Sequence, residues 1–107
     1  MEISVYEKPI IEKFVTVNGV EFEFGVLLCC LEEIRRTEVD DHYGDRSLRD
    51  YELSHPNEMD KLVKMGLVKN YTGSRMANLY CMKDESAIND LVSKLYDADE
   101  KFISSIK

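Results

Sequence analysis

Apolar and polar residues alternate with two different periods along this chain, and the two periods predict strands near the N-terminus and helices further on. In residues 13–24, apolar residues flank the dipeptide Asn18-Gly19, whose two residues tolerate positive φ. This pattern is typical of a β-hairpin. The alternative is that Asn18-Gly19 is a loop leading directly into the first helix.

A broad apolar face at helical spacing predicts that first helix, from Glu21 or Glu23 to Thr37. Arg35 and Arg36 near its end have the charge that the negative end of the helix dipole favours. A helix with so wide an apolar face is expected at the centre of the core.

The middle of the chain predicts two further helices separated by a break. Residues 37–45 are acidic and rich in turn-forming residues, so we expect a loop there, followed by a short helix over residues 47–53. Ser54-His55-Pro56 then interrupts the pattern. Because Pro is favoured in the first turn of a helix and Gly after the last, the next helix is expected over residues 56–66.

The last third of the chain predicts a hairpin and a long helix. Residues 66–71 and 76–82 are rich in apolar and aromatic residues, and the Gly-containing segment 72–75 between them predicts a turn. Residues 86–105 have one apolar stripe at helical spacing, which predicts an amphipathic helix about 30 Å long.

The segment Leu62-Val63-Lys64-Met65-Gly66-Leu67-Val68 resembles the end of the third helix in the winged helix-turn-helix superfamily of bacterial, archaeal and phage regulators. The resemblance implies a single α+β domain over residues 1–107, with a three-helix core, a two-stranded wing and a long C-terminal helix. Residues 22–83 form the core in this reading, with the wing at about 67–83. Residues 1–20 are then an N-terminal extension or hairpin, and the helix at 86–105 closes the domain.

The resemblance also implies a DNA-binding transcriptional regulator that acts as a homodimer through its C-terminal helix. The helix at about 56–66 is the recognition helix, and a dimer supplies the two half-sites of a palindromic operator. The residues expected to contact DNA are His55, Asn57 and Lys61 at bases, and Arg46, Arg49, Lys64, Lys69 and Arg75 at phosphates.

Charge opens an alternative to DNA. The net charge is −7, with −6 in residues 1–41, +2 in residues 42–83 and −3 in residues 84–107. Only the middle third is basic, and Glu58 and Asp60 place negative charge on the expected recognition helix. The alternative function is an acidic module, of phage or plasmid type, that binds a protein partner and not DNA.

Composition makes other functions less favoured. No apolar run reaches the ~20 residues that cross a bilayer, and the acidic N-terminus is unlike a signal peptide, so we expect a cytoplasmic protein. Cys29, Cys30 and Cys81 lack the spacing of a metal or disulfide framework, and we expect neither a metal nor another cofactor. No motif for a catalytic nucleophile or a phosphate loop occurs, so an enzyme is not expected.

Overall fold

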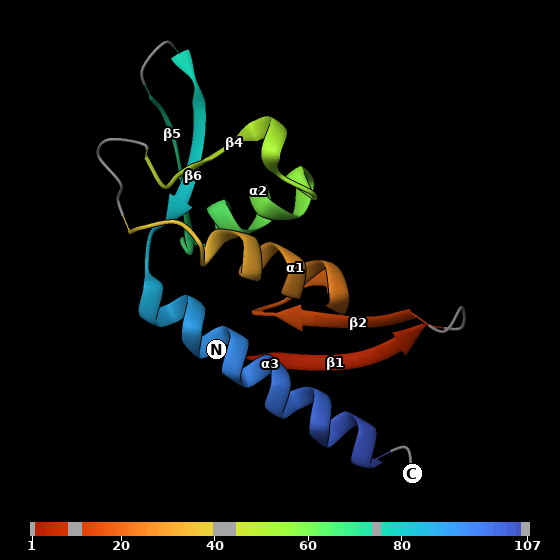
Figure 1. The fold of residues 1–107 in the computed structure, drawn as a ribbon. Helices are drawn as coiled ribbons and strands as arrows, with labels where there is room; N and C mark the ends of the chain where they lie inside the picture. The colour runs from red at the N-terminus through yellow and green to blue at the C-terminus, as the bar shows by residue number, and fades with distance from the viewer. Residues whose placement is uncertain (1, 9–11, 40–44, 74–75, 106–107) are drawn as a thin grey trace.

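The computed structural model describes residues 2–8, 12–39, 45–73 and 76–105 (Figure 1). Within these residues the chain is an α+β protein with three α-helices and two antiparallel sheets of three strands each. Its elements, in chain order, are β1 (Ile3–Lys8), β2 (Glu12–Val17), β3 (Val20–Glu23), α1 (Phe24–Ile34), β4 (Leu48–Arg49), the one-turn 3₁₀ helix η1 (Asp50–Glu52), α2 (Pro56–Lys64), β5 (Val68–Thr72), β6 (Asn78–Met82) and α3 (Glu85–Ser105).

Strands β1, β2 and β3 form sheet A, in that spatial order. Asn18 and Gly19 have positive φ, 51° and 81°, and they join β2 to β3 in a two-residue hairpin loop. The hairpin interpretation of this segment is therefore correct, and the alternative loop is wrong. Strand β1 pairs along the other edge of β2, where Val5 lies opposite Val15.

Sheet B lies on the other side of α1 and has the spatial order β4-β6-β5 (Figure 1). Val68 of β5 lies opposite Met82 of β6, and Leu48 of β4 lies opposite Tyr80. The buried Thr37 connects this sheet to α1. Its hydroxyl donates to the carbonyl of Ile34 at 2.6 Å and accepts the Met82 N–H at 3.0 Å.

One hydrophobic cluster joins both sheets and all three helices. Helix α1 lies between the sheets (Figure 1), and its buried side chains belong to the same cluster as buried side chains from strands of both sheets. Burial of this apolar surface is the main source of stability. The fully buried side chains of the cluster are Val15, Val17, Phe22, Leu27, Cys30, Leu31, Ile34, Met59, Leu62, Val68, Ile88, Leu91 and Leu95.

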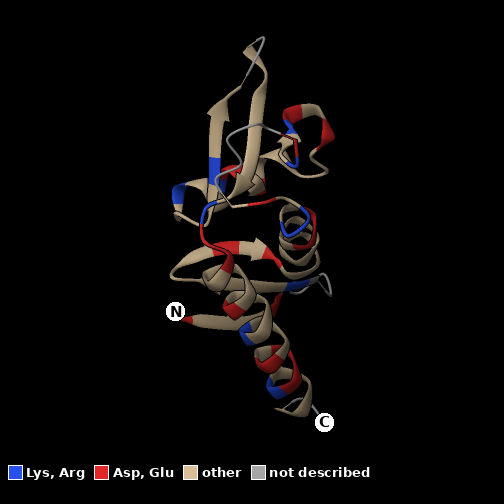
Figure 2. Cartoon of the chain, turned by 60° about the vertical axis from the view of Figure 1, so that its left-hand side comes forward, with Lys and Arg blue, Asp and Glu red and all other residues tan. Residues whose placement is uncertain are grey.

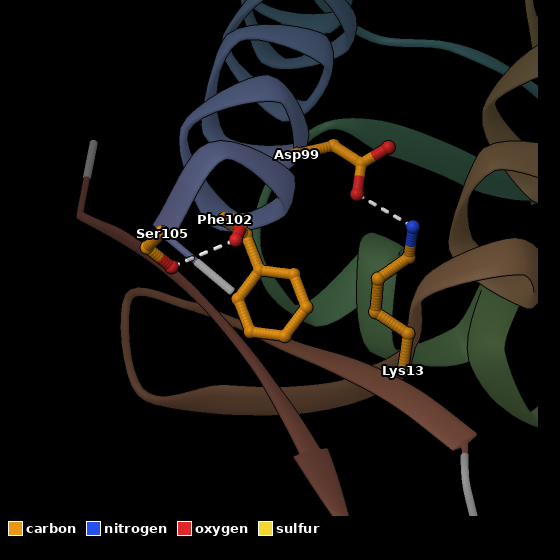
Figure 3. Close-up of polar contacts among 4 residues, drawn as sticks. All are labelled: Lys13, Asp99, Phe102 and Ser105. Carbon is orange, nitrogen blue, oxygen red and sulfur yellow. Dashed lines mark hydrogen bonds and ion pairs between the residues drawn. The ribbon is translucent and has the colours of Figure 1, made fainter. Parts of the chain in front are cut away.

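Helix α3 continues well past its last fully buried residue, Leu95. Its distal half is anchored to sheet A by Lys13, whose Nζ lies 2.5 Å from Asp99 Oδ1. The same ammonium group lies 4.6 Å from the centre of the Phe24 ring. Figure 3 shows Lys13 reaching from β2 toward Asp99, with the Phe102 ring beside it. In the described part of the chain, no helix combines the length and apolar character needed to span a membrane.

The expected winged helix-turn-helix with a three-helix core is wrong. Residues 47–53, predicted as its second helix, form only the two-residue strand β4 and the single turn η1. Leu48 and Leu53 are five positions apart and do not share a helical face. The Asp50 carboxylate also accepts the Tyr51 N–H at 2.8 Å, a local bond that competes with helix formation.

The remaining parts of that fold prediction change with it. The expected two-stranded wing is part of the three-stranded sheet B, because β4 pairs with β6. Within the predicted extension or hairpin at residues 1–20, the described segments Ile3–Lys8 and Glu12–Val17 are strands of the three-stranded sheet A. The first helix begins at Phe24, since residues 20–23 alternate between inward and outward positions and pair with β2.

Candidate interaction surfaces

The residues expected to contact DNA come from four segments, and the structure gives them different surroundings. Asn57 and Lys64 are exposed on α2, and Arg49 is exposed on β4. His55 is partly buried at the N-cap of α2, where its carbonyl accepts the Met59 N–H at 3.0 Å. The exposed members therefore provide separate polar positions on α2 and β4.

Lys61 does not extend away from the molecule into solvent. Its Nζ donates to the backbone carbonyl of Glu21 at 3.0 Å and lies 5.2 Å from the centre of the Phe22 ring. The preceding residue, Asp60, accepts the Tyr80 hydroxyl hydrogen bond at 3.1 Å. Helix α2 is thus tied to sheet A on one side and to sheet B on the other.

The other basic positions also lie beside acidic or aromatic groups. Arg46 Nε lies 3.9 Å from Glu38 Oε1, and Lys69 Nζ lies 5.4 Å from the Tyr71 ring centre. Arg75, expected at the wing, lies outside the described residues. Basic and acidic ribbon segments are interspersed in Figure 2, with acidic residues on both η1 and α3.

The cysteines have the burial expected of structural thiols. Cys30 and Cys81 are buried, and Cys29 is partly buried. Burial and then the negative charge of Glu33 raise the pKa of Cys30 to about 12, so this thiol stays protonated at neutral pH. Among the described residues, no group of three or more His, Cys, Asp or Glu side chains has the geometry to hold a metal ion.

Glu33 holds the segment that precedes α2. Its Oε2 accepts the backbone N–H of Ser54 at 3.3 Å and the Ser54 hydroxyl at 2.7 Å. Its other oxygen, Oε1, is buried without a hydrogen-bond partner. This carboxylate explains how the chain is fixed before Pro56 although η1 supplies little regular structure.

Sheet A has one covered face and one face on which no described helix packs. Lys13, Val15 and Val17 point to the covered face, where Lys13 contacts both α1 and α3. The alternate positions form the outer face, and Tyr6 and Phe14 there do not belong to the core cluster or pack against it. The outer-face side chains that the structure describes are Ser4, Tyr6, Phe14, Thr16, Glu21 and Glu23.

An aromatic pair occupies the middle of this outer face. Tyr6 and Phe14 are directly opposite in the register, with ring centres 6.0 Å apart and ring planes at 21°. The Tyr6 hydroxyl donates to Glu21 Oε2 at 2.6 Å. This hydrogen bond is the largest cause that raises the pKa of Tyr6 to about 12, so the phenol remains a donor at neutral pH.

Our sequence reasoning missed this face. The signal is the alternation of residues 3–6, Ile-Ser-Val-Tyr, which predicts a strand whose Tyr6 side chain lies on the other face from the partly buried Val5. The predicted hairpin at Asn18-Gly19 includes only β2 and β3, so β1 and the aromatic pair that it completes lie outside that prediction.

Helix α3 exposes two large apolar residues on one side. Tyr96 has 52% of its surface exposed and Ile103 has 40%. They are seven positions apart, so they lie on the same side of the helix, two turns from each other.

Comparison with known proteins gave no match, whether against family models, curated proteins or solved structures.

Proposed function

We propose that this chain is a protein-interaction module that binds its partner through the outer face of sheet A. The observation that carries the proposal is the aromatic pair Tyr6 and Phe14 on a sheet face where no described helix packs. A sheet with one buried face normally presents polar residues on the other. Aromatic residues are enriched at protein interfaces because they bury a large apolar area and lose little side-chain freedom.

The charge distribution supports a protein partner over DNA. DNA affinity comes mainly from basic side chains that neutralise phosphates. Three of the expected cations have contacts within the molecule: Lys61 bonds to sheet A, Arg46 lies near a carboxylate, and Lys69 lies over the Tyr71 ring. With a net charge of −7, the whole molecule repels a duplex at long range.

A test that separates the two partner classes places a photo-reactive amino acid at Thr16 on the outer face or at Asn57 on α2. Crosslinked partners are identified, purified and titrated against the full chain, and random-sequence duplex DNA is titrated across a salt series. The matched variants are Thr16→Lys on the outer face and Lys64→Ala on α2, both at positions outside the core.

The proposal predicts that a purified protein crosslinked through Thr16 binds with defined stoichiometry, and that Thr16→Lys abolishes this binding while Lys64→Ala leaves it unchanged. The opposite pattern would establish DNA as the partner. In that case the affinity for duplex DNA falls as salt is added, Lys64→Ala weakens it, and Thr16→Lys leaves it unchanged. That second pattern, without a protein bound at the outer face, would overturn the proposal.

We also propose that a second copy of the chain packs against the exposed side of α3. An antiparallel pairing centred between residues 99 and 100 sets Tyr96 of one copy against Ile103 of the other. We therefore expect a dimer by light scattering, and a monomer of unchanged helicity for Tyr96→Ser combined with Ile103→Ser. A dimer that survives this double substitution would show that its interface lies elsewhere.

A further inference from the structure

The outer face of sheet A combines aromatic rings with carboxylates, and this combination selects a kind of ligand. Tyr6 and Phe14 form the aromatic pair, and Glu23 lies directly opposite Phe14 on β3. Glu21 is two positions away on the same strand, where its carboxylate accepts the Tyr6 hydrogen bond. Two carboxylates therefore border the aromatic pair on the β3 side.

The face has an excess of negative charge. Among its side chains that the structure describes, Glu21 and Glu23 are acidic and none is basic. A ligand of complementary charge is consequently a cation.

The chain shows the same recognition chemistry on its covered face. There, the Lys13 ammonium lies 4.6 Å from the centre of the Phe24 ring and pairs with Asp99. A cation held between an aromatic face and a carboxylate is attracted both by the ring quadrupole and by the opposite charge. The outer face provides these two components from Tyr6, Phe14 and Glu23.

Arginine fits this surface better than lysine. Its planar guanidinium stacks on aromatic rings, and its N–H groups bond to a carboxylate in two parallel contacts. A lysine ammonium is a compact and strongly hydrated charge, and it gains less from a ring surface that is open to water.

We propose that the outer face of sheet A binds an arginine-containing segment of a partner protein, with one guanidinium against the Tyr6–Phe14 pair and in contact with Glu23. This inference rests on the proposed function, because it names the partner class for the same surface. Charge complementarity selects the occupant: the face is acidic, and its aromatic rings suit a planar cation.

The experiment measures fluorescence anisotropy of labelled peptides titrated with the full chain. Three peptides share a Gly-Ser framework and differ at two positions, which are arginine, lysine or citrulline. Citrulline keeps nearly the same shape as arginine without its charge. We expect the arginine peptide to bind most tightly, the lysine peptide more weakly and the citrulline peptide least.

Two variants test whether the arginine peptide binds at the outer face of sheet A. Glu23→Gln and Glu7→Gln make the same charge change on exposed residues of sheet A, but Glu7 is at a register position of the opposite face. We expect Glu23→Gln to raise the Kd of the arginine peptide roughly 3- to 10-fold and Glu7→Gln to change it less than about twofold. Tyr6→Leu, which keeps apolar bulk and removes the aromatic ring, is expected to weaken binding by a similar factor.

Equal affinities for the arginine and citrulline peptides, or equal effects of Glu23→Gln and Glu7→Gln, would overturn this inference. Its failure is distinguishable from failure of the proposed function. If a purified partner still binds through Thr16 while the arginine peptides do not, the partner class is wrong and the interaction surface stands. If no protein binds this face at all, both fail.

Discussion

The Tyr6 hydroxyl donates its hydrogen bond to a carboxylate, and this contact makes its ionisation a direct probe of the outer face. Because the pKa of Tyr6 is about 12 in the folded chain, above its ordinary value of about 10, the folded state holds the proton more tightly. The resulting stabilisation is complete below pH 10 and is lost as the pH rises through about 12.

We therefore expect a difference titration of tyrosinate absorbance, wild type minus Tyr6→Phe, to show one group with a midpoint near pH 12. Glu21→Gln removes the charged acceptor and should move that midpoint back toward 10. A Tyr6 midpoint near 10 in the wild type would contradict the hydrogen bond. An unchanged midpoint in Glu21→Gln would assign the shift to burial alone.

Gly66 ends α2 in a conformation that other residues rarely adopt. Its φ is +82°, and the N–H groups of Gly66 and Leu67 bond back to the carbonyls of Val63 and Leu62 at 3.0 and 3.1 Å. A Cβ at Gly66 meets no atom within 4 Å, so a steric clash does not add to the cost of Gly66→Ala. We expect this substitution to reduce the free energy of unfolding by about 1 to 2 kcal/mol, because alanine is strained at positive φ.

Gly25→Ala in α1 is the matched control for this loss. Its φ is not positive, and its added Cβ only approaches a side-chain oxygen at 3.8 Å, so alanine should be neutral or stabilise the chain by up to about 1 kcal/mol. Urea denaturation of both variants measures the difference. Equal changes in the two variants would show that the left-handed conformation at Gly66 is not the cause.

Single residues differ in how much of their role a sequence reveals. Gly66 and Asn18-Gly19 were predictable because their requirement is local: each sits in a turn that needs positive φ. Tyr6 and Lys61 depend on partners distant in sequence, Glu21 for the first and a backbone carbonyl of sheet A for the second. Side-chain pairing across such separations has no local pattern, so alternation could indicate the face on which Tyr6 lies but not the contacts that it makes there.

Among the elements, the distal half of α3 depends on a small number of contacts with sheet A. The pair formed by Lys13 and Asp99 is partly buried, with 31% and 20% of the side-chain surfaces exposed. We expect Asp99→Asn to reduce the free energy of unfolding by about 0.5 to 1 kcal/mol and to speed amide hydrogen exchange in residues 99–105.

Asp97→Asn provides the control on the same helix, because Asp97 is exposed and its substitution removes the same charge as Asp99→Asn. It should alter neither stability nor exchange in the monomeric form at low protein concentration. Faster exchange in both variants alike would indicate a general effect of helix charge and not the loss of the anchor that Lys13 provides.

Elements with a long or unambiguous pattern were predicted closely, and the short ones were not. The stripe of apolar residues in α3 persists for five turns, and α2 has proline and glycine at its two ends. The segment at β4 and η1 offers two apolar residues in seven, which is too little to distinguish a helix from a strand. Its structure is set by pairing of Leu48 with Tyr80, a tertiary contact.

At the scale of the whole molecule, one core connects two sheets that lie on opposite sides of α1. Leu27 is fully buried in α1, and it belongs to the cluster that includes side chains from sheet A and sheet B. Because the sheets share this core, neither has a separate set of buried residues large enough to hold it folded alone. The chain should therefore unfold in one cooperative step.

Leu27→Ala tests this cooperativity. Removing a fully buried leucine side chain should reduce the free energy of unfolding by about 2 to 5 kcal/mol, whereas Leu28→Ala, at a partly buried position of the same helix, should reduce it less. Hydrogen exchange by mass spectrometry then reports on β2 and β6 separately. If the core is one unit, the slowest amides of both strands lose the same protection, since their exchange requires global unfolding. Retained protection in β6 beside a loss in β2 would show that the sheets unfold independently and that α1 couples them only weakly.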